Sequence, residues 1–197
     1  MDQSKKMNFP YRLILASKSP RRKALLESLG LDFEVESNEV DESFDESLDP
    51  NGVAEFLAKK KSYGFRELSN DELLISSDTT VILNGKVLGK PADKKEAIQM
   101  ITSLSNNTHQ VVSGVCLRTR EKEVSFSVST TVSFDSIESS EIEHYIDQYK
   151  PFDKAGAYGI QEWIGMIGIK SIEGDYYNVV GLPVNNLYQT LKREFSV

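Results

Sequence analysis

Six charged side chains scattered along this 197-residue chain have the chemistry needed to handle a polyphosphate. They are two carboxylates and four cations: Glu42, Asp78, Arg21, Arg22, Lys61 and Lys90. Arginine and lysine neutralise phosphate oxygens, and magnesium needs few protein carboxylates when substrate phosphates complete its octahedron. The set therefore predicts a polyphosphate site in which two acids are enough to help hold a divalent metal.

The turn from Ser17 to Arg22 joins an apolar strand, which begins at Arg12, to a predicted helix. Ser19 suits the N-cap, Pro20 the first helical position and Gly30 the C-terminal cap. Free N–H groups, the helix dipole and nearby cations all favour an anion there. The nearby cations are Lys18, Arg21, Arg22 and Lys23. A capped surface helix with solvated charges explains the same residues, so the turn alone does not decide.

Asp78 lies within the run from Leu73 to Leu83, where five polar residues interrupt an otherwise strand-like apolar pattern. Burying an unpaired carboxylate would cost several kcal/mol. Asp78 therefore needs a cation, a hydrogen-bond network, a metal ion or open water in a cleft. A turn between two strands, with Asp78 exposed, accounts for the pattern equally well.

Lys61 falls inside the apolar arc of a helix predicted from Gly52 to Leu68, whereas Lys59 points away from that arc. Snorkelling, in which the aliphatic stem packs and the ammonium returns to water, is the usual explanation. The alternative is a lysine whose ammonium reaches an anion in a cleft. Lys60 lies at the edge of the arc and stays a second candidate.

Lys90 and Gln161 are weaker candidates. Lys90 precedes Pro91, which restricts its backbone to extended forms. Gln161 ends a glycine-rich loop that starts at Asp153, and its amide could read a polar group such as a base, although a turn residue is the commoner role.

Composition excludes several classes of function. His109 and His144 are too few and too far apart for a typical zinc site, and the single cysteine, Cys116, excludes a cysteine-rich one. Neither a G-x-S-x-G elbow nor a Walker loop occurs. The net charge of −7 argues against a nucleic-acid partner. With no signal-peptide pattern and no long apolar run, we expect a cytoplasmic protein that does not use a membrane.

The predicted elements alternate between strands and helices. After the first strand and helix, further strands are expected over residues 32–37, 73–83, 109–119, 124–134 and 166–172, with a hairpin turn at Asn84-Gly85. An acidic loop covers 38–50, and helices are expected over 52–68 and 93–105, around Ile142 to Tyr149 and from Pro183. This order predicts a tail, residues 1–11, and one α/β domain, residues 12–197, with a mixed twisted sheet flanked by helices.

Eight short motifs follow one another along nearly the whole chain after residue 11. They are Leu-Ala-Ser-Lys-Ser-Pro-Arg-Arg, Val-Asp-Glu-Ser, Leu-Ala-Lys-Lys-Lys, Ser-Asp-Thr-Thr-Val, Leu-Gly-Lys-Pro, Thr-His-Gln-Val, Asp-Lys-Ala-Gly-Ala-Tyr-Gly-Ile-Gln and Tyr-Asn-Val-Val-Gly-Leu-Pro. In order and spacing they resemble the motifs of the Maf-type nucleotide pyrophosphatases, which hydrolyse nucleoside triphosphates to the monophosphate and pyrophosphate. The resemblance implies a two-lobed fold with a central cleft, a divalent metal (Mg or Mn) and a homodimer.

The same resemblance assigns roles to individual residues. Asp78 is implied to be the catalytic acidic residue and the proton acceptor, Glu42 to hold the metal with it, and Lys61 to act beside them. Phosphate binding is implied for Ser17, Arg21, Arg22, Lys61 and Lys90. Choice of the nucleobase is implied for Arg21, Thr79 and Gln161.

The motif that ends at Gln161 resembles the branch acting on dTTP and UTP. The chain departs from the commoner pattern directly afterwards, where Glu162-Trp163 replaces small residues. This departure leaves open the branch that prefers a methylated guanosine triphosphate. A second alternative, implied by the family's association with septum formation and cell division, is a non-catalytic nucleotide sensor that regulates them.

Overall fold

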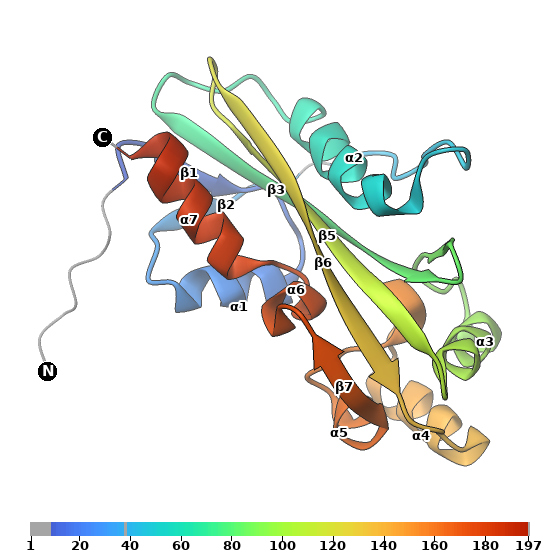
Figure 1. The fold of residues 1–197 in the computed structure, drawn as a ribbon. Coiled ribbons are helices and arrows are strands. Elements are labelled where there is room, and N and C mark those ends of the chain that lie inside the picture. Colours follow the sequence, from blue (N-terminus) through green and yellow to red (C-terminus); the bar gives the residue numbers. More distant parts are fainter. Residues whose placement is uncertain (1–8, 38, 197) are drawn as a thin grey trace, which may run out of the picture.

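The computed structural model describes residues 9–37 and 39–196. Within them, seven strands form one mixed, twisted sheet with helices on both faces (Figure 1). The predicted α/β class with a mixed sheet is thereby confirmed. Most of the predicted tail and the first residue of the predicted acidic loop, Asn38, lie outside the described residues.

The strands are β1 (Arg12–Leu15), β2 (Phe33–Val35), β3 (Glu72–Leu83), β4 (Lys86–Leu88), β5 (Thr108–Arg118), β6 (Glu123–Phe134) and β7 (Ile169–Glu173). The helices are α1 (Pro20–Ser28), α2 (Pro50–Tyr63), α3 (Lys94–Leu104), α4 (Ser139–Tyr149), α5 (Trp163–Gly168), α6 (Tyr176–Val180) and α7 (Val184–Phe195), with a 3₁₀ turn, η1 (Ala155–Ala157). The sheet order is β2-β1-β3-β5-β6-β7, and β4 also pairs with β3. Strands β2, β1 and β3 run parallel, and the other pairs are antiparallel.

Strand β3 joins two hydrophobic cores. Because side chains alternate along a strand, Leu73, Ile75, Val81 and Leu83 all point to one face of the sheet. The first two belong to a core with α1 and α7, and the last two belong to a core with α3, α4 and α5. These two cores correspond to the two lobes that the resemblance implies, and the polar residues of β3 lie between them.

The polar segment of β3 coincides with a change of strand partner along one edge. β1 pairs with residues 72–75 and β4 with residues 81–83, while β5 pairs with residues 74–82 along the other edge. The alternative of a turn at Asp78 is therefore wrong, because the ladder with β5 keeps β3 continuous. Residues 76–80 border instead on the carboxyl end of β1 and the turn that follows it.

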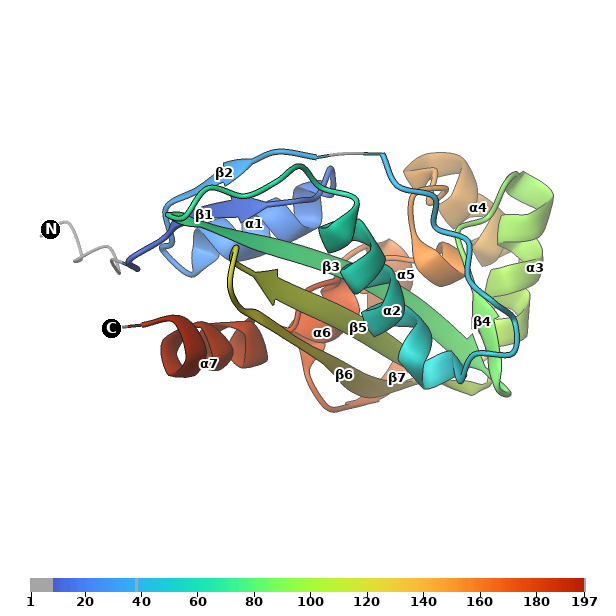
Figure 2. The ribbon, with the colours of Figure 1, turned by 90° about the horizontal axis from the view of Figure 1, so that it is seen from above.

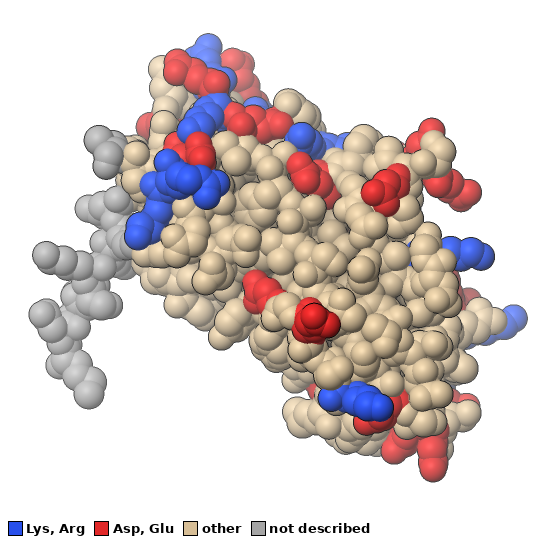
Figure 3. All heavy atoms as spheres, in the orientation of Figure 1, with Lys and Arg blue, Asp and Glu red and all other residues tan. Residues whose placement is uncertain are grey.

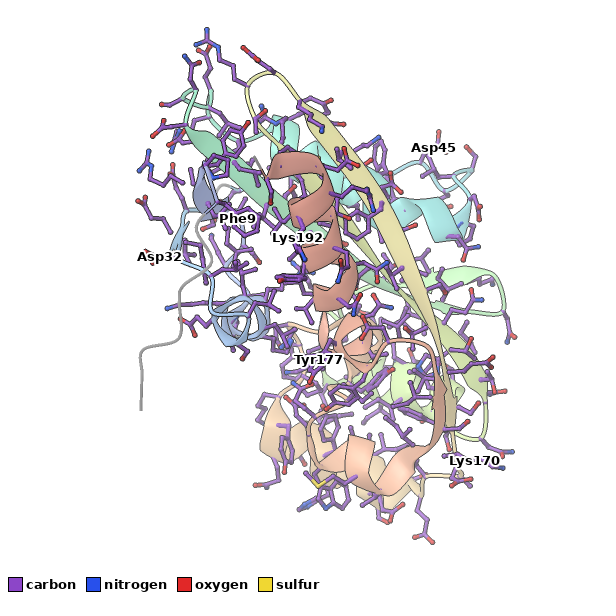
Figure 4. All side chains as sticks on the ribbon, turned by 60° about the vertical axis from the view of Figure 1, so that its left-hand side comes forward. Phe9, Asp32, Asp45, Lys170, Tyr177 and Lys192 are labelled. Atoms are coloured by element: carbon purple, nitrogen blue, oxygen red, sulfur yellow. The ribbon has the colours of Figure 1, made fainter. Side chains whose placement is uncertain are left out.

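Helix α2 lies on one face of the central strands, while α1, α6 and α7 lie on the opposite face (Figure 2). In Figure 4 the labelled Tyr177 marks α6, next to the start of α7, and Lys192 lies on the exposed side of α7. The opposite side of α7 buries Leu187 and Leu191, as the apolar stripe predicted. No helix in these described ranges is long and apolar enough to cross a membrane.

Two local predictions are confirmed in detail. In α1, the Arg22 N–H donates to Ser19 Oγ over 3.4 Å, and Pro20 occupies the first turn. In the hairpin between β3 and β4, Asn84 has a φ of 50° and Gly85 a φ of 75°. Positive φ at both central positions is the geometry that favours Asn-Gly in tight hairpins.

Helix α2 is shorter than predicted at its carboxyl end. It begins at Pro50 after the Asp49 N-cap and ends at Tyr63, where the Gly64 N–H donates to Lys60 O. Phe65, which extended the apolar arc in the sequence, is buried from the loop that follows. Its helical spacing thus reflects burial and not continued helix.

The stretch predicted as a strand over residues 166–172 divides into α5 and β7. Before Gly168 the chain makes local helical hydrogen bonds, such as Gly165 N–H to Glu162 O over 3.0 Å. It pairs with β6 only from Ile169 onward. The strand prediction is correct for the second part and wrong for the first.

Candidate active site

A cleft of about 820 Å³ opens beside residues 78–81 of β3. The segments that line it include the turn after β1, the segment before α2, the β3–β4 hairpin, the loop 153–161 and the end of α6. All nine side chains predicted for a site lie on its wall: Ser17, Arg21, Arg22, Glu42, Lys61, Asp78, Thr79, Lys90 and Gln161. The structure thus brings these nine positions together, while their roles stay predictions.

Lys61 and Asp78 form the centre of the cleft. The Lys61 ammonium donates to Asp78 Oδ1, and it lies 2.9 Å from Glu42 Oε1. The side chains of Lys61 and Asp78 are only 16% and 11% exposed. Lys61 therefore reaches an anion inside the protein and does not snorkel to water, and Asp78 obtains the cation that its burial requires.

Glu42 extends this charged centre toward the cleft mouth. Its second oxygen, Oε2, accepts a hydrogen bond from Lys90 Nζ over 2.9 Å. Burial acts to raise the pKa of Glu42, but the hydrogen bonds from Lys61 and Lys90 outweigh it and lower the pKa to about 2. Glu42 is thus ionised at neutral pH, with both oxygens held by lysines.

Close packing of α2 on the sheet places Lys61 over Asp78. The strand residue paired with Asp78 is Gly114 on β5. A Cβ at Gly114 would lie 2.3 Å from the backbone of Ala54, so only glycine lets the helix approach this closely. Ser76 Oγ then donates to Ala58 O over 2.8 Å, which ties the same helix to β3.

Arg22 is fixed on the opposite side of β3. Its Nε donates to Gly181 O over 2.9 Å, and its Nη2 donates to Thr79 Oγ1 over 3.1 Å. Thr79 Oγ1 also lies 2.8 Å from Ser113 Oγ on β5. Burial lowers the pKa of Arg22, and the charge of Asp78 opposes that shift. Arg22 is therefore oriented before any ligand binds.

Arg21 reaches the loop that begins at Asp153. Its Nη1 lies 2.8 Å from Asp153 Oδ2, and the ammonium of Lys154 lies 2.8 Å from Asp153 Oδ1. Although burial acts to raise it, the hydrogen bonds from Lys154 and Arg21 lower the pKa of Asp153 to about 2. Asp153 and Lys154 belong to the motif that ends at Gln161, but the sequence predicted a role for neither residue.

The remaining cations near the first turn face other partners. Lys18 is exposed and pairs with Glu39 over 3.0 Å at the rim, and Lys23 pairs with Glu27 over 3.7 Å outside the cleft. Lys60, the second candidate on α2, pairs with the exposed Asp41 over 3.2 Å. The inward cations of this part of the chain are thus Arg21, Arg22 and Lys61.

Among the carboxylates that line the cleft, Glu42 and Asp78 are the pair that shares one cation and could share a metal ion. In the described part of the chain, no group of three or more His, Cys, Asp or Glu side chains could hold an ion by itself. Asp78 and Glu42 nevertheless converge on one cation, the Lys61 ammonium. This donor set fits a magnesium-type ion that arrives with phosphates, because such ions use one or two carboxylates plus phosphate oxygens and water.

Charged side chains of both signs are interspersed over the face shown in Figure 3, and its middle is largely uncharged. Binding to a nucleic-acid backbone needs clustered lysine and arginine. The face in Figure 3 shows no such basic patch among the residues it describes.

A protein-family model described as Maf-like protein matches residues 12–194. The chain is 48% identical to a relative from Parabacteroides distasonis over 184 residues, which covers 92% of this chain and 95% of that relative. It is 49% identical to a relative from Bacteroides thetaiotaomicron, with 93% and 96% covered, and 47% identical to one from Flavobacterium psychrophilum, with 90% and 91% covered. Each of the three is named a dTTP/UTP pyrophosphatase.

Proposed function

The chain belongs to the Maf family, and from this premise we propose that it hydrolyses dTTP and UTP to the monophosphate and pyrophosphate. The observation that carries the proposal is the inward lysine: Lys61 joins Asp78 and Glu42 inside a cleft whose other walls hold arginines. Such a site pairs cations that suit phosphates with carboxylates that suit a metal and a water molecule.

Substrate binding is proposed to exchange the partners within this charged centre. Triphosphate oxygens would take the ammonium groups of Lys61 and Lys90, which now hold Glu42. Glu42 and Asp78 would then be free to hold the divalent ion, Mg or Mn. When bound, this ion neutralises phosphate charge and favours deprotonation of water. With both ligands bound, every buried charge of this centre again has a partner.

The chemical step follows from the position of Asp78. A water molecule attacks the α-phosphorus, the bond from that phosphorus to the oxygen bridging to the β-phosphate breaks, and pyrophosphate leaves. Asp78 accepts the proton that the water loses. Arg22 and Lys61 stabilise the negative charge that develops on the phosphates.

The nucleobase is proposed to lie toward Arg21, Thr79 and Gln161, which all line the cleft. Arg21 is held by Asp153 and Thr79 by Ser113, so two of the three side chains are fixed in advance. Preorganised polar groups favour one pattern of donors and acceptors on the base.

The direct test is to mix the purified chain with dTTP or UTP and magnesium and to measure both products. Equal amounts of monophosphate and pyrophosphate are expected, and chelation of the metal should stop the reaction until Mg or Mn is restored. A methylated guanosine triphosphate in the same panel tests the other branch. Release of orthophosphate would contradict the proposal. Tight nucleotide binding without turnover would also contradict it and would favour a nucleotide sensor.

The proposal also includes a homodimer, which rests on the family resemblance. Sedimentation equilibrium should give the mass of two chains. A single-chain mass over the concentration range of the activity assay would remove the dimer from the proposal without affecting the chemistry.

A further inference from the structure

Glu162, which directly follows Gln161, lies at the centre of a polar network behind the cleft wall. Its Oε1 lies 3.2 Å from Lys154 Nζ, and its Oε2 accepts a hydrogen bond from the hydroxyl of Tyr145. Its own N–H donates to Gly159 O over 3.0 Å. Glu162 therefore connects α4 to both parts of the loop 153–161.

The network continues to Arg21 at the base end of the cleft. Lys154 bridges the carboxylates of Glu162 and Asp153, and Asp153 holds Arg21 Nη1. Four charges of alternating sign thus run from Glu162 to Arg21. Because the Lys154 side chain is only 9% exposed, it depends on these two carboxylates for compensation.

Tyr145 anchors the same network from α4. Its side chain is fully buried, and its hydroxyl accepts a hydrogen bond from the Gly159 N–H over 3.0 Å. Burial, followed by the hydrogen bond to Glu162, raises the pKa of Tyr145, so the hydroxyl keeps its proton and donates to Glu162. The Glu162 carboxylate therefore contacts helix α4 through Tyr145 and the loop 153–161 through Lys154.

Loss of the Glu162 charge would change the balance at Arg21. Lys154 would keep one carboxylate partner, Asp153, and would draw that carboxylate away from Arg21, which holds its other oxygen. A nearly buried cation binds its remaining partner more strongly than an arginine that is partly solvated. Arg21 would then lose the contact that orients it, and the loop that ends at Gln161 would lose the ion pair between Lys154 and Glu162 that ties its two ends together.

We propose that Glu162 is a positioning residue that fixes Arg21 and Gln161 and thereby sets both the affinity for the nucleobase and the choice between bases. This inference rests on the proposed function, because it assumes that these two residues contact the base.

The test compares Glu162→Gln with Tyr145→Phe and with a matched control, Glu143→Gln, which removes a charge from an exposed position of α4. Steady-state kinetics with dTTP, UTP and dGTP give KM, kcat and the ratio of kcat/KM between bases. For Glu162→Gln, we expect KM for dTTP and UTP to rise roughly tenfold with kcat nearly unchanged, and the preference over dGTP to fall. Tyr145→Phe should shift both quantities in the same direction but less, and the control should match the parent chain.

A merely structural role gives a different pattern. Partial unfolding lowers the apparent kcat for all bases equally and leaves both KM and the base ratio unchanged. An unchanged KM and base ratio in Glu162→Gln would therefore overturn the inference. Equilibrium binding of a non-hydrolysable dTTP analogue separates the two claims: a parent chain without turnover contradicts the proposed function, while the affinity of the variants still tests positioning.

Discussion

At the scale of single residues, the cleft is built from opposite charges that neutralise one another before any ligand arrives. Lys61 holds Asp78 and Glu42, and Lys90 holds the second oxygen of Glu42. A triphosphate is negative, so it can replace the carboxylates as the partner of the two lysines. A metal ion is positive, so it can replace the lysines as the partner of the two carboxylates. The pairs therefore keep the site ordered without leaving a buried charge uncompensated.

Replacing Asp78 by Asn tests the residue assigned to the proton. We expect turnover to fall by a factor on the order of a hundred or more, because an amide cannot accept the proton from water. The melting temperature should stay within a few degrees of the parent value, because Lys61 keeps Glu42 as a partner. Asp71→Asn, an exposed change beside β3, is the control. Near-normal turnover of Asp78→Asn would remove Asp78 from this role.

Replacing Lys61 by Ala tests whether the inward lysine handles phosphate. We expect KM for dTTP to rise by roughly tenfold or more, because one cation is lost from the triphosphate wall. Lys59→Ala removes a more exposed lysine of the same helix and should leave KM unchanged. Normal kinetics for Lys61→Ala would mean that the lysine has a structural role only.

At this scale, the sequence predicted those features that depend on neighbouring residues alone. The helical arc alone indicated that Lys61 points inward, and the buried strand pattern indicated that Asp78 needs a partner. It could not show that Arg21 meets Asp153, 132 positions away, or that Thr79 meets Ser113. Such pairings depend on the order of strands in the sheet, which no local pattern contains.

At the scale of elements, the position of α2 on the sheet decides the geometry of the site. The helix lies so close to β5 that a side chain at Gly114 would collide with the backbone of Ala54. Caps and the Asn84-Gly85 hairpin followed from single residues and were predictable. The end of α2 at Tyr63 was not, because the buried Phe65 in the following loop continues the apolar spacing of the helix. The division of 166–172 into α5 and β7 was not, because a short apolar run fits a helix or a strand equally well.

Gly114→Ala should therefore weaken both the fold and the site. We expect the free energy of unfolding in urea to fall by about 1–3 kcal/mol, because the helix must shift to admit a methyl group. The same shift moves Lys61 relative to Asp78, so kcat/KM should fall in the protein that remains folded. Gly52→Ala, where the nearest atom lies 3.9 Å from the new Cβ, is the matched control on α2. Equal stability of the two variants would contradict this account of the packing.

At the scale of the whole molecule, one long strand carries two cores and leaves a polar interval between them. The cleft lies at that interval, where β1 ends and β4 has not yet begun. The mixed α/β class was predictable from the alternation of elements. The use of a single strand by both lobes was not, because it depends on where two other strands pair along its edge.

His109 lies against Phe134 in the core that includes α3, α4 and α5, and its burial makes the stability of the whole molecule depend on pH. His109 is 2% exposed, and burial lowers its pKa from 6.5 to about 4. The unfolded chain therefore takes up a proton as the pH falls below 6.5, whereas the folded chain does so only near 4. The free energy of unfolding should accordingly fall by about 2 kcal/mol from about pH 7 to about pH 5 through this residue.

Denaturant unfolding at these two pH values checks this effect. His109→Phe keeps an aromatic ring against Phe134 and should remove most of the pH-dependent loss, even if its stability at neutral pH is lower. His144→Gln, which changes an exposed histidine, is the control. The same pH-dependent loss in His109→Phe as in the parent chain would show that His109 is not its source.

The account as a whole rests on attack of water at the α-phosphorus in the cleft beside Asp78. Hydrolysis of dTTP or UTP in H₂¹⁸O, followed by mass spectrometry of both products, locates the new oxygen. The account predicts that the label enters the monophosphate and that the pyrophosphate carries none. Label in the pyrophosphate would contradict it, because the attack would then have occurred at the β-phosphorus.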